Sequence, residues 1–172
     1  MLVPYDPSWP DQFRAAAESL KQVGNPQWTV EHIGSTAIPG LSAKPIIDLA
    51  VRVEDARDFQ RHRPALVCDG WRTGSSVRTH DVMLRERDGT RTHIAHFFAS
   101  AVWGEVNQRL FRDWLLAHPT DALRYQEVKR LAVKDAAVGL GAYNAAKTTI
   151  VQELVDRARA ERGLPSVSVS DK

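Results

Sequence analysis

One acid interrupts an apolar run of six residues, from Ile46 to Val51. A continuous apolar run of this length is typical of a strand that is buried on both faces of a sheet. Burying a carboxylate there is costly unless the group is paired, hydrogen-bonded or bound to a metal. The run therefore predicts a central strand in which Asp48 either belongs to a functional site or is a polar core group satisfied by hydrogen bonds.

A second strand is expected just before this run, and it ends in a polar turn. Residues 28–33, Trp-Thr-Val-Glu-His-Ile, alternate like a strand and lead into Gly34-Ser35-Thr36. Glycine lets the backbone approach a bulky anion, and the backbone amides and the Ser35 and Thr36 hydroxyls can donate to phosphate oxygens. Asp48 can hold a divalent cation that bridges those oxygens. The alternative is an ordinary turn beside a structural acid.

Patterns elsewhere predict a mixed chain. Ser8-Trp9-Pro10-Asp11 has the residues of a helix start, with Ser8 as the cap, and a helix is expected from there to Gln22. Beyond the central strand we expect a helix over 54–62, strands over 65–71, 82–87 and 92–98 with Asp88-Gly89 as a hairpin turn, and three helices from Trp103 onward. The predicted fold class is α/β (α+β): a small mixed sheet flanked by helices, with a helical C-terminal half.

Length and composition exclude several classes of protein. The 172 residues fit one core, so we expect a single domain over residues 1–162 and a disordered tail over 163–172. A formal charge of +2 argues against bulk nucleic-acid binding, and the apolar stretches are shorter than the ~20 residues of a membrane span. The single cysteine, Cys68, is expected to be a small buried residue. We expect a cytoplasmic protein whose partners are anionic small molecules or nucleotides.

Four basic residues could neutralise an anionic substrate: Lys44, Arg112, Lys129 and Lys147. Lys129 follows Tyr125 by four residues, and Lys147 follows Tyr143 by four, so each pair shares a helix face. Lys44, next to Pro45, could anchor a phosphate or pair with an acid. In each case the alternative is a solvated side chain.

Two histidines lie on one expected strand. His93 and His96 are three residues apart, so on a strand they point to opposite faces, which weakens any claim that both bind one metal ion. Each could be catalytic or structural. We expect His62, His80 and His118 to be structural or incidental.

These residues together resemble the GrpB family, a branch of the nucleotidyltransferase superfamily that is also found fused behind dephospho-CoA kinase domains. The resemblance covers nearly the whole chain, through the blocks Tyr5-Asp6-Pro7-Ser8-Trp9, Glu31-His32-Ile33-Gly34-Ser35-Thr36-Ala37-Ile38-Pro39-Gly40-Leu41, Ala43-Lys44-Pro45-Ile46-Ile47-Asp48-Leu49 and Phe111-Arg112-Asp113-Trp114-Leu115.

The resemblance implies a nucleotidyltransferase-type fold in which Gly34 and Ser35 match the turn that holds triphosphate, and Asp48 matches the first metal-binding acid. Two departures matter. The superfamily pattern has a second carboxylate two residues after the first, where this chain has Ala50. The branch commonly has a His-His-Leu-His strand, in which Ile94 replaces the middle histidine here.

The leading hypothesis is an enzyme that transfers a nucleoside monophosphate from a nucleoside triphosphate to a small acceptor, with Mg²⁺ as cofactor. Its candidate catalytic residues are Asp48, which also holds the metal, His93 and His96, and its candidate phosphate- or substrate-binding residues are His32, Gly34, Ser35, Thr36, Lys44, Arg112, Lys129 and Lys147. Because Ala50 replaces an acid, a second hypothesis is acid-base or group-transfer chemistry of small-molecule metabolism without nucleotidyl transfer. A third is a non-catalytic ligand-binding module.

Overall fold

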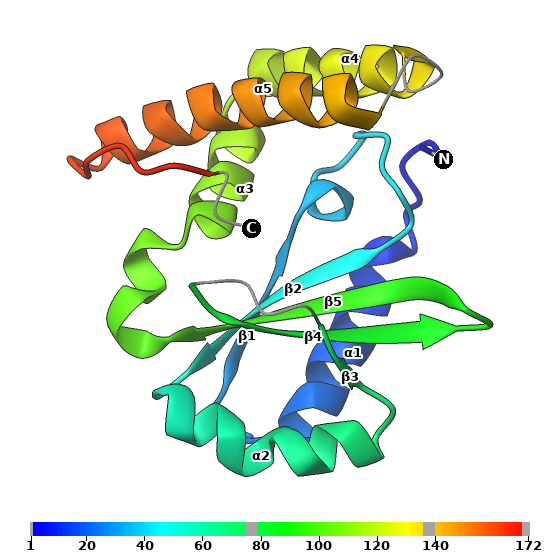
Figure 1. The fold of residues 1–172 in the computed structure, drawn as a ribbon, viewed down its shortest axis with the longest axis vertical. Coiled ribbons are helices and arrows are strands. Elements are labelled where there is room, and N and C mark those ends of the chain that lie inside the picture. Colours follow the sequence, from blue (N-terminus) through cyan, green and yellow to red (C-terminus); the bar gives the residue numbers. More distant parts are fainter. Residues whose placement is uncertain (1, 75–78, 136–139, 170–172) are drawn as a thin grey trace.

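The computed structural model describes residues 2–74, 79–135 and 140–169, without the side chains of residues 132–146. The elements, drawn in Figure 1, are α1 (Trp9–Val23), β1 (Thr29–Ile33), the 3-10 turn η1 (Ser35–Ala37), β2 (Ile47–Val53), α2 (Ala56–Cys68), β3 (Arg72–Thr73), β4 (Asp81–Arg87), β5 (Thr90–Ala99), the 3-10 segment η2 (Ser100–Glu105), α3 (Asn107–Ala117), α4 (Pro119–Asp135) and α5 (Leu140–Glu161).

The five strands form one mixed sheet in the order β1-β2-β5-β4-β3. The pair of β2 with β5 is parallel, and the other neighbouring pairs are antiparallel. Helices α1 and α2 cover one face, while α3 descends from the α4–α5 layer toward the other (Figure 1). The expected mixed sheet with a helical C-terminal half is therefore confirmed.

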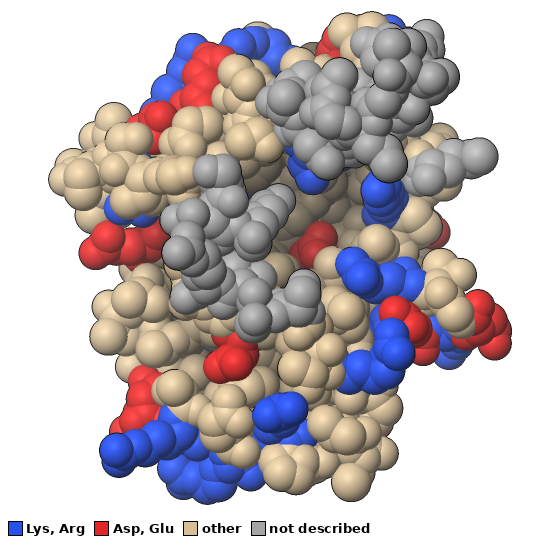
Figure 2. Space-filling model, viewed as in Figure 1, with Lys and Arg blue, Asp and Glu red and all other residues tan. Residues whose placement is uncertain are grey.

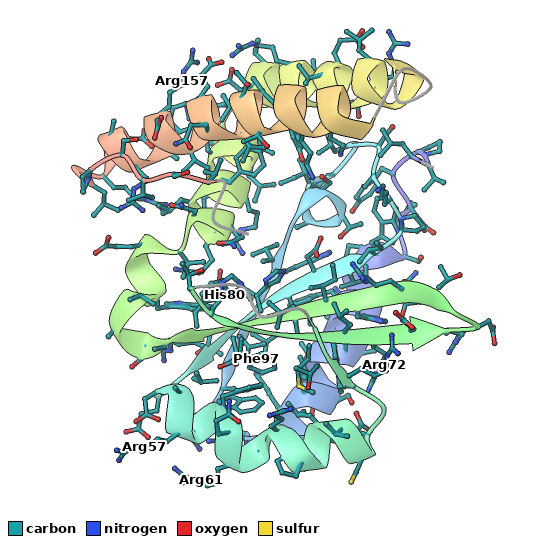
Figure 3. The ribbon with its side chains drawn as sticks, in the orientation of Figure 1. Arg57, Arg61, Arg72, His80, Phe97 and Arg157 are labelled. Atoms are coloured by element: carbon teal, nitrogen blue, oxygen red, sulfur yellow. The ribbon has the colours of Figure 1, made fainter. Side chains whose placement is uncertain are left out.

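The two faces of β2 have different surroundings. Leu49 and Val51 point into the main core, which β5 extends with Ala95 and Phe97 on the side of α1 and α2. Figure 3 shows Phe97 pointing toward α2. On the other face, Ala50 lies in a smaller apolar cluster with η2. Asp48 shares this second face, because successive strand residues alternate sides.

A third apolar cluster joins α3, α4 and α5 to the loop that precedes β2. Leu115, Tyr125 and Leu154 pack there against Ile38 and Leu41. The cluster fixes the C-terminal helices above the turn between β1 and β2. None of the helices in the described ranges is long and apolar enough to cross a membrane.

One expected strand is wrong. Residues 65–68 belong to α2, which continues through Pro64 to Cys68. Phe59 and Leu66 are seven residues apart on the same helix face and are both buried, so core packing carries the helix past the proline. Cys68 ends the helix exposed, in contrast to the expected burial.

Smaller differences concern helix ends. Ser8 makes no side-chain capping bond; its backbone amide donates instead to Asp6, over 2.8 Å. Trp103 lies in η2, and α3 starts only at Asn107. The hairpin at Asp88-Gly89 is confirmed, with φ angles of 51° and 73°.

The tail that we expect to be disordered, residues 163–172, is described in part, and its disorder stays a prediction. Described residues 163–169 run back along α5, where Gln152 donates to the Val167 carbonyl and accepts from the Val169 amide, both over 2.9 Å. Residues 170–172 lie outside the described residues.

Candidate functional site

The turn between β1 and β2 brings a glycine against the acid of the central strand. Ile33 lies opposite Asp48 in the antiparallel pair, and Gly34 follows with a φ of 73°. A Cβ atom on Gly34 would lie 2.4 Å from Asp48 Oδ2, so both the φ angle and the space require glycine here. The backbone of the turn therefore runs directly beside the half-buried carboxylate.

Buried Thr36 and half-buried His32 fix this turn in place. The Thr36 hydroxyl donates to the Ile46 carbonyl over 3.1 Å, and it lies 3.0 Å from His32 Nε2, which can donate to it. The His32 ring stacks on Phe13 of α1 with centroids 4.7 Å apart. Burial, with a contribution from Arg112, lowers the pKa of His32 to about 4, so the ring is neutral at pH 7. His32 and Thr36 thus have clear structural contacts that position Ser35.

Lys129 connects α4 to the same turn. Its Nζ donates to Ser35 Oγ over 2.9 Å and to the Ser42 carbonyl over 2.8 Å, and it lies 4.9 Å from the centre of the Tyr125 ring. The residue is only 3% exposed. Burial, and then the charge of Lys147, lower its pKa to about 8. Lys129, from the helical half, therefore contacts the Ser35 hydroxyl, which the sequence analysis predicts to donate to phosphate.

These side chains line one cavity of about 240 Å³, formed by Leu2, Ser35, Thr36, Lys44, Ile46, Asp48, Ile94, Tyr125, Lys129 and Lys147. Six of the predicted site residues thus meet there, and Gly34 adjoins them through Asp48. Figure 2 shows acidic atoms in a hollow below the α4–α5 layer, with basic atoms near its rim. The Lys129 ammonium lies over Tyr125 as their spacing predicted, whereas the Tyr143 side chain lies outside the described residues.

Arg112 does not line this cavity. Its guanidinium contacts Glu31 over 2.8 Å and Asp113 over 2.6 Å, and it donates to the His32 carbonyl over 3.0 Å. Arg109 binds the same Glu31 through two bonds of 3.0 and 2.8 Å. Burial opposes ionisation of Glu31, but the two arginines outweigh it and lower the pKa of that carboxyl. The cluster ties α3 to β1.

The histidines of β5 lie on opposite faces, as their spacing predicts. His93 lines a separate cavity of about 660 Å³ beside α1, with Arg85, and burial, Arg85 and Arg87 lower its pKa. His96 lies opposite Ala50 on the face that carries Asp48. Its Nδ1 is 2.8 Å from His80 Nε2. Figure 3 shows His80 on the side of the sheet away from Phe97.

The donor set fits one magnesium ion. Mg²⁺ is usually held by one or two carboxylates together with substrate phosphates, and Asp48 supplies one carboxylate next to the phosphate-sized cavity. Ala50 is fully buried and Ile94 lies opposite Asp48, so neither neighbouring position offers a second acid. Among the described residues, no three histidine, cysteine or acidic side chains group as a metal site.

Sequence reasoning missed one residue of this region, Arg109, and one contact, between His80 and His96. Arg109 is three residues before Arg112, and that spacing on one helix face was the available signal. His80, expected to be structural or incidental, bonds to His96, and burial lowers the pKa of His80 to about 4. Nothing in the sequence around His80 indicates this contact.

Comparison with known proteins adds close and distant relatives. A UPF0157 protein of Halalkalibacterium halodurans is 38% identical over 92% of this chain and 82% of its own length. The dephospho-CoA kinase of Mycolicibacterium paratuberculosis is 29% identical over 91% of this chain, which spans only 45% of that enzyme.

Among solved structures, the conserved protein GrpB from Enterococcus faecalis superposes with a TM-score of 0.78 and 26% identity, over 91% of this chain and 98% of that one. Terminal uridylyl transferase 4 from Trypanosoma brucei, with bound dUTP, gives a TM-score of 0.56 and 13% identity, over 95% of this chain and 57% of that one. The second likeness shows a shared nucleotidyltransferase fold alone. Residues 1–157 match the family model described as GrpB protein. The chain therefore belongs to the GrpB family.

Proposed function

We propose that this protein is a nucleotidyltransferase-type enzyme that transfers a nucleoside monophosphate from a nucleoside triphosphate to a small acceptor. The observation that carries the proposal is the 2.9 Å bond from Lys129 Nζ to Ser35 Oγ inside the cavity that Asp48 lines. Cationic and hydroxyl donors beside one carboxylate suit a phosphate chain with a divalent cation. The fold shared with terminal uridylyl transferase 4 supports the same class of reaction.

In this reaction an acceptor oxygen bonds to the α-phosphorus, the bond from that phosphorus to the bridging oxygen breaks, and pyrophosphate leaves. Ser35 and the backbone beside Gly34 would bind the phosphates, while Lys44, Lys129 and Lys147 neutralise them. Asp48 would hold one Mg²⁺, and such an ion neutralises charge on the phosphates. His96 would take the acceptor proton, since it shares the sheet face of Asp48 whereas His93 does not.

Titration calorimetry with each of the four common nucleoside triphosphates, with and without Mg²⁺, tests this proposal. We expect binding that Mg²⁺ strengthens, and in the presence of Mg²⁺ Asp48→Ala should weaken it about tenfold or more, because the metal loses its carboxylate ligand. Glu18→Gln, at an exposed carboxyl of α1, is the control and should leave binding unchanged. Absence of binding for all four nucleotides in the folded protein would contradict the proposal.

Ala50 favours a second candidate, in which the same cavity serves acid-base or group-transfer chemistry on an anionic substrate without nucleotidyl transfer. Loss of one metal acid weakens a two-metal mechanism, while the pKa of Lys129, about 8, suits proton transfer. Here Asp48→Asn should impair turnover equally with and without Mg²⁺. Binding without any product would instead indicate a ligand-binding module.

A further inference from the structure

Apolar side chains surround Ala50, the position at which the superfamily pattern has a second metal-binding acid. Ala50 is fully buried and packs in a cluster with Ile33, Phe98, Trp103 and Val106. A carboxylate at that position would lose its hydration among these groups. The cavity beside Asp48 is therefore closed to a second metal acid on β2.

Positive charge gathers in the lining of this cavity. Three lysines, Lys44, Lys129 and Lys147, line the cavity together with the single carboxylate of Asp48. Lys129 is held in place by Ser35 and Ser42, which use two of its three ammonium donors. Lys147 is near enough to lower the pKa of Lys129. Two neighbouring ammonium groups repel, and a polyanion between them removes that cost.

We propose that the cavity binds a polyphosphate chain mainly through its lysines, so that Lys129 and Lys147 neutralise the charge that a second metal ion neutralises in a two-metal site. This inference rests on the proposed function and makes it more specific, because the ligand is a linear polyphosphate that binds with one divalent cation or with none. Asp48 then weakens binding of the polyphosphate when no metal is present, and strengthens binding when a metal ion bridges the carboxylate and the polyphosphate.

The probe is inorganic tripolyphosphate, titrated into the whole chain in the presence of a chelator. We expect binding without metal, strengthened about threefold or more by Asp48→Asn because a negative charge facing the anion is removed. With Mg²⁺ added, the same substitution should weaken binding. This reversal of sign is specific to a site whose lysines bind the anion directly.

Two lysine variants complete the experiment. Lys147→Met should weaken metal-free binding about tenfold, and Lys129→Met about 30-fold, because Lys129 is the more deeply buried cation. Circular dichroism checks that each variant is folded. If Lys129→Met does not fold, the binding measured for Lys147→Met tests the proposal alone. Lys21→Met, on α1, is the matched control and should bind as the parent does.

The inference is overturned if tripolyphosphate requires Mg²⁺ for binding, if Asp48→Asn weakens metal-free binding, or if Mn²⁺ titration followed by electron paramagnetic resonance finds two ions in the nucleotide complex. Metal-free binding of tripolyphosphate without binding of any nucleoside triphosphate would support this site and contradict the proposed function. Nucleotide binding that depends on two metal ions would support the function and contradict the lysine site.

Discussion

Two charged clusters lie above the same face of β1 and β2, and they differ in how their charges are balanced. Glu31 is held by Arg109 and Arg112 through bonds of 2.8 to 3.0 Å. Asp48, on the neighbouring strand β2, shares its cavity with three lysines. The first cluster uses forked guanidinium groups, which match a carboxylate, and the second uses ammonium groups. The arginines join α3 to the sheet, whereas under the proposed function the lysines bind an anion from outside the chain.

The largest effect on the comparison of the two clusters is expected from a second acid placed on β2, next to the lysine cavity. Ala50→Asp would put a carboxylate into the apolar cluster of Trp103 and Phe98, so we expect a loss of ~3 kcal/mol or more in the free energy of unfolding. Urea unfolding at pH 7 measures it. Arg52→Asp, at an exposed position of the same strand, is the control, with an expected change below about 1 kcal/mol. A loss for Ala50→Asp no larger than the control's would mean that β2 can accept a second metal acid.

The arginine cluster can be weakened without changing its shape. Glu31→Gln leaves two part-buried guanidinium groups with a neutral partner, and we expect the free energy of unfolding to fall by ~2 kcal/mol. The matched control is Glu127→Gln, whose ion pair with Arg130 is about half exposed and should change stability by ~0.5 kcal/mol or less. Thermal unfolding compares the two. Equal effects would contradict a structural role for the arginine cluster.

The sequence was sufficient to predict the central strand, the turn at Gly34 and the shared helix face of Tyr125 and Lys129. Those features follow from local rules: an apolar run around Asp48, a glycine at a close approach, and the four-residue spacing of Tyr125 and Lys129. Arg112 was assigned to the substrate, but its partner in the structure is Glu31, which is distant in the chain. The neighbouring Arg109 meets the same Glu31 across 78 residues. No local pattern encodes such a pairing.

The extent of α2 was missed for a similar reason. Pro64 marks a break by local rules, and the burial of Leu66 in the main core outweighs it. His80 and His96, too, are brought together by the pairing of β4 with β5. Where local propensity and tertiary contacts disagree, packing between distant segments therefore determines the structure.

The smallest expected effect is the change with pH of the affinity for tripolyphosphate, which depends on the lysine cluster. The pKa of Lys129 is lowered to about 8, and a bound polyphosphate raises it again, so the complex takes up a proton when it forms above that pH. Affinity for tripolyphosphate should therefore fall about fivefold to tenfold between pH 7 and pH 9. Lys147, Tyr125 and Asp48 also line this cavity, and Lys129→Met isolates the contribution of Lys129 by flattening the profile.

The same lowered pKa has an opposite consequence for the ligand-free protein. Between pH 8 and the ordinary lysine value of 10.5, the unfolded chain holds more protons at Lys129 than the folded chain does. The stability of the folded state at this group therefore rises with pH in that window, while affinity for the anion falls. Glu31 does not titrate there, because its two arginines lower the pKa of the carboxyl and so move it further from this range. A parallel fall of stability and affinity would show that Lys129 is not the buried cation that binds the ligand.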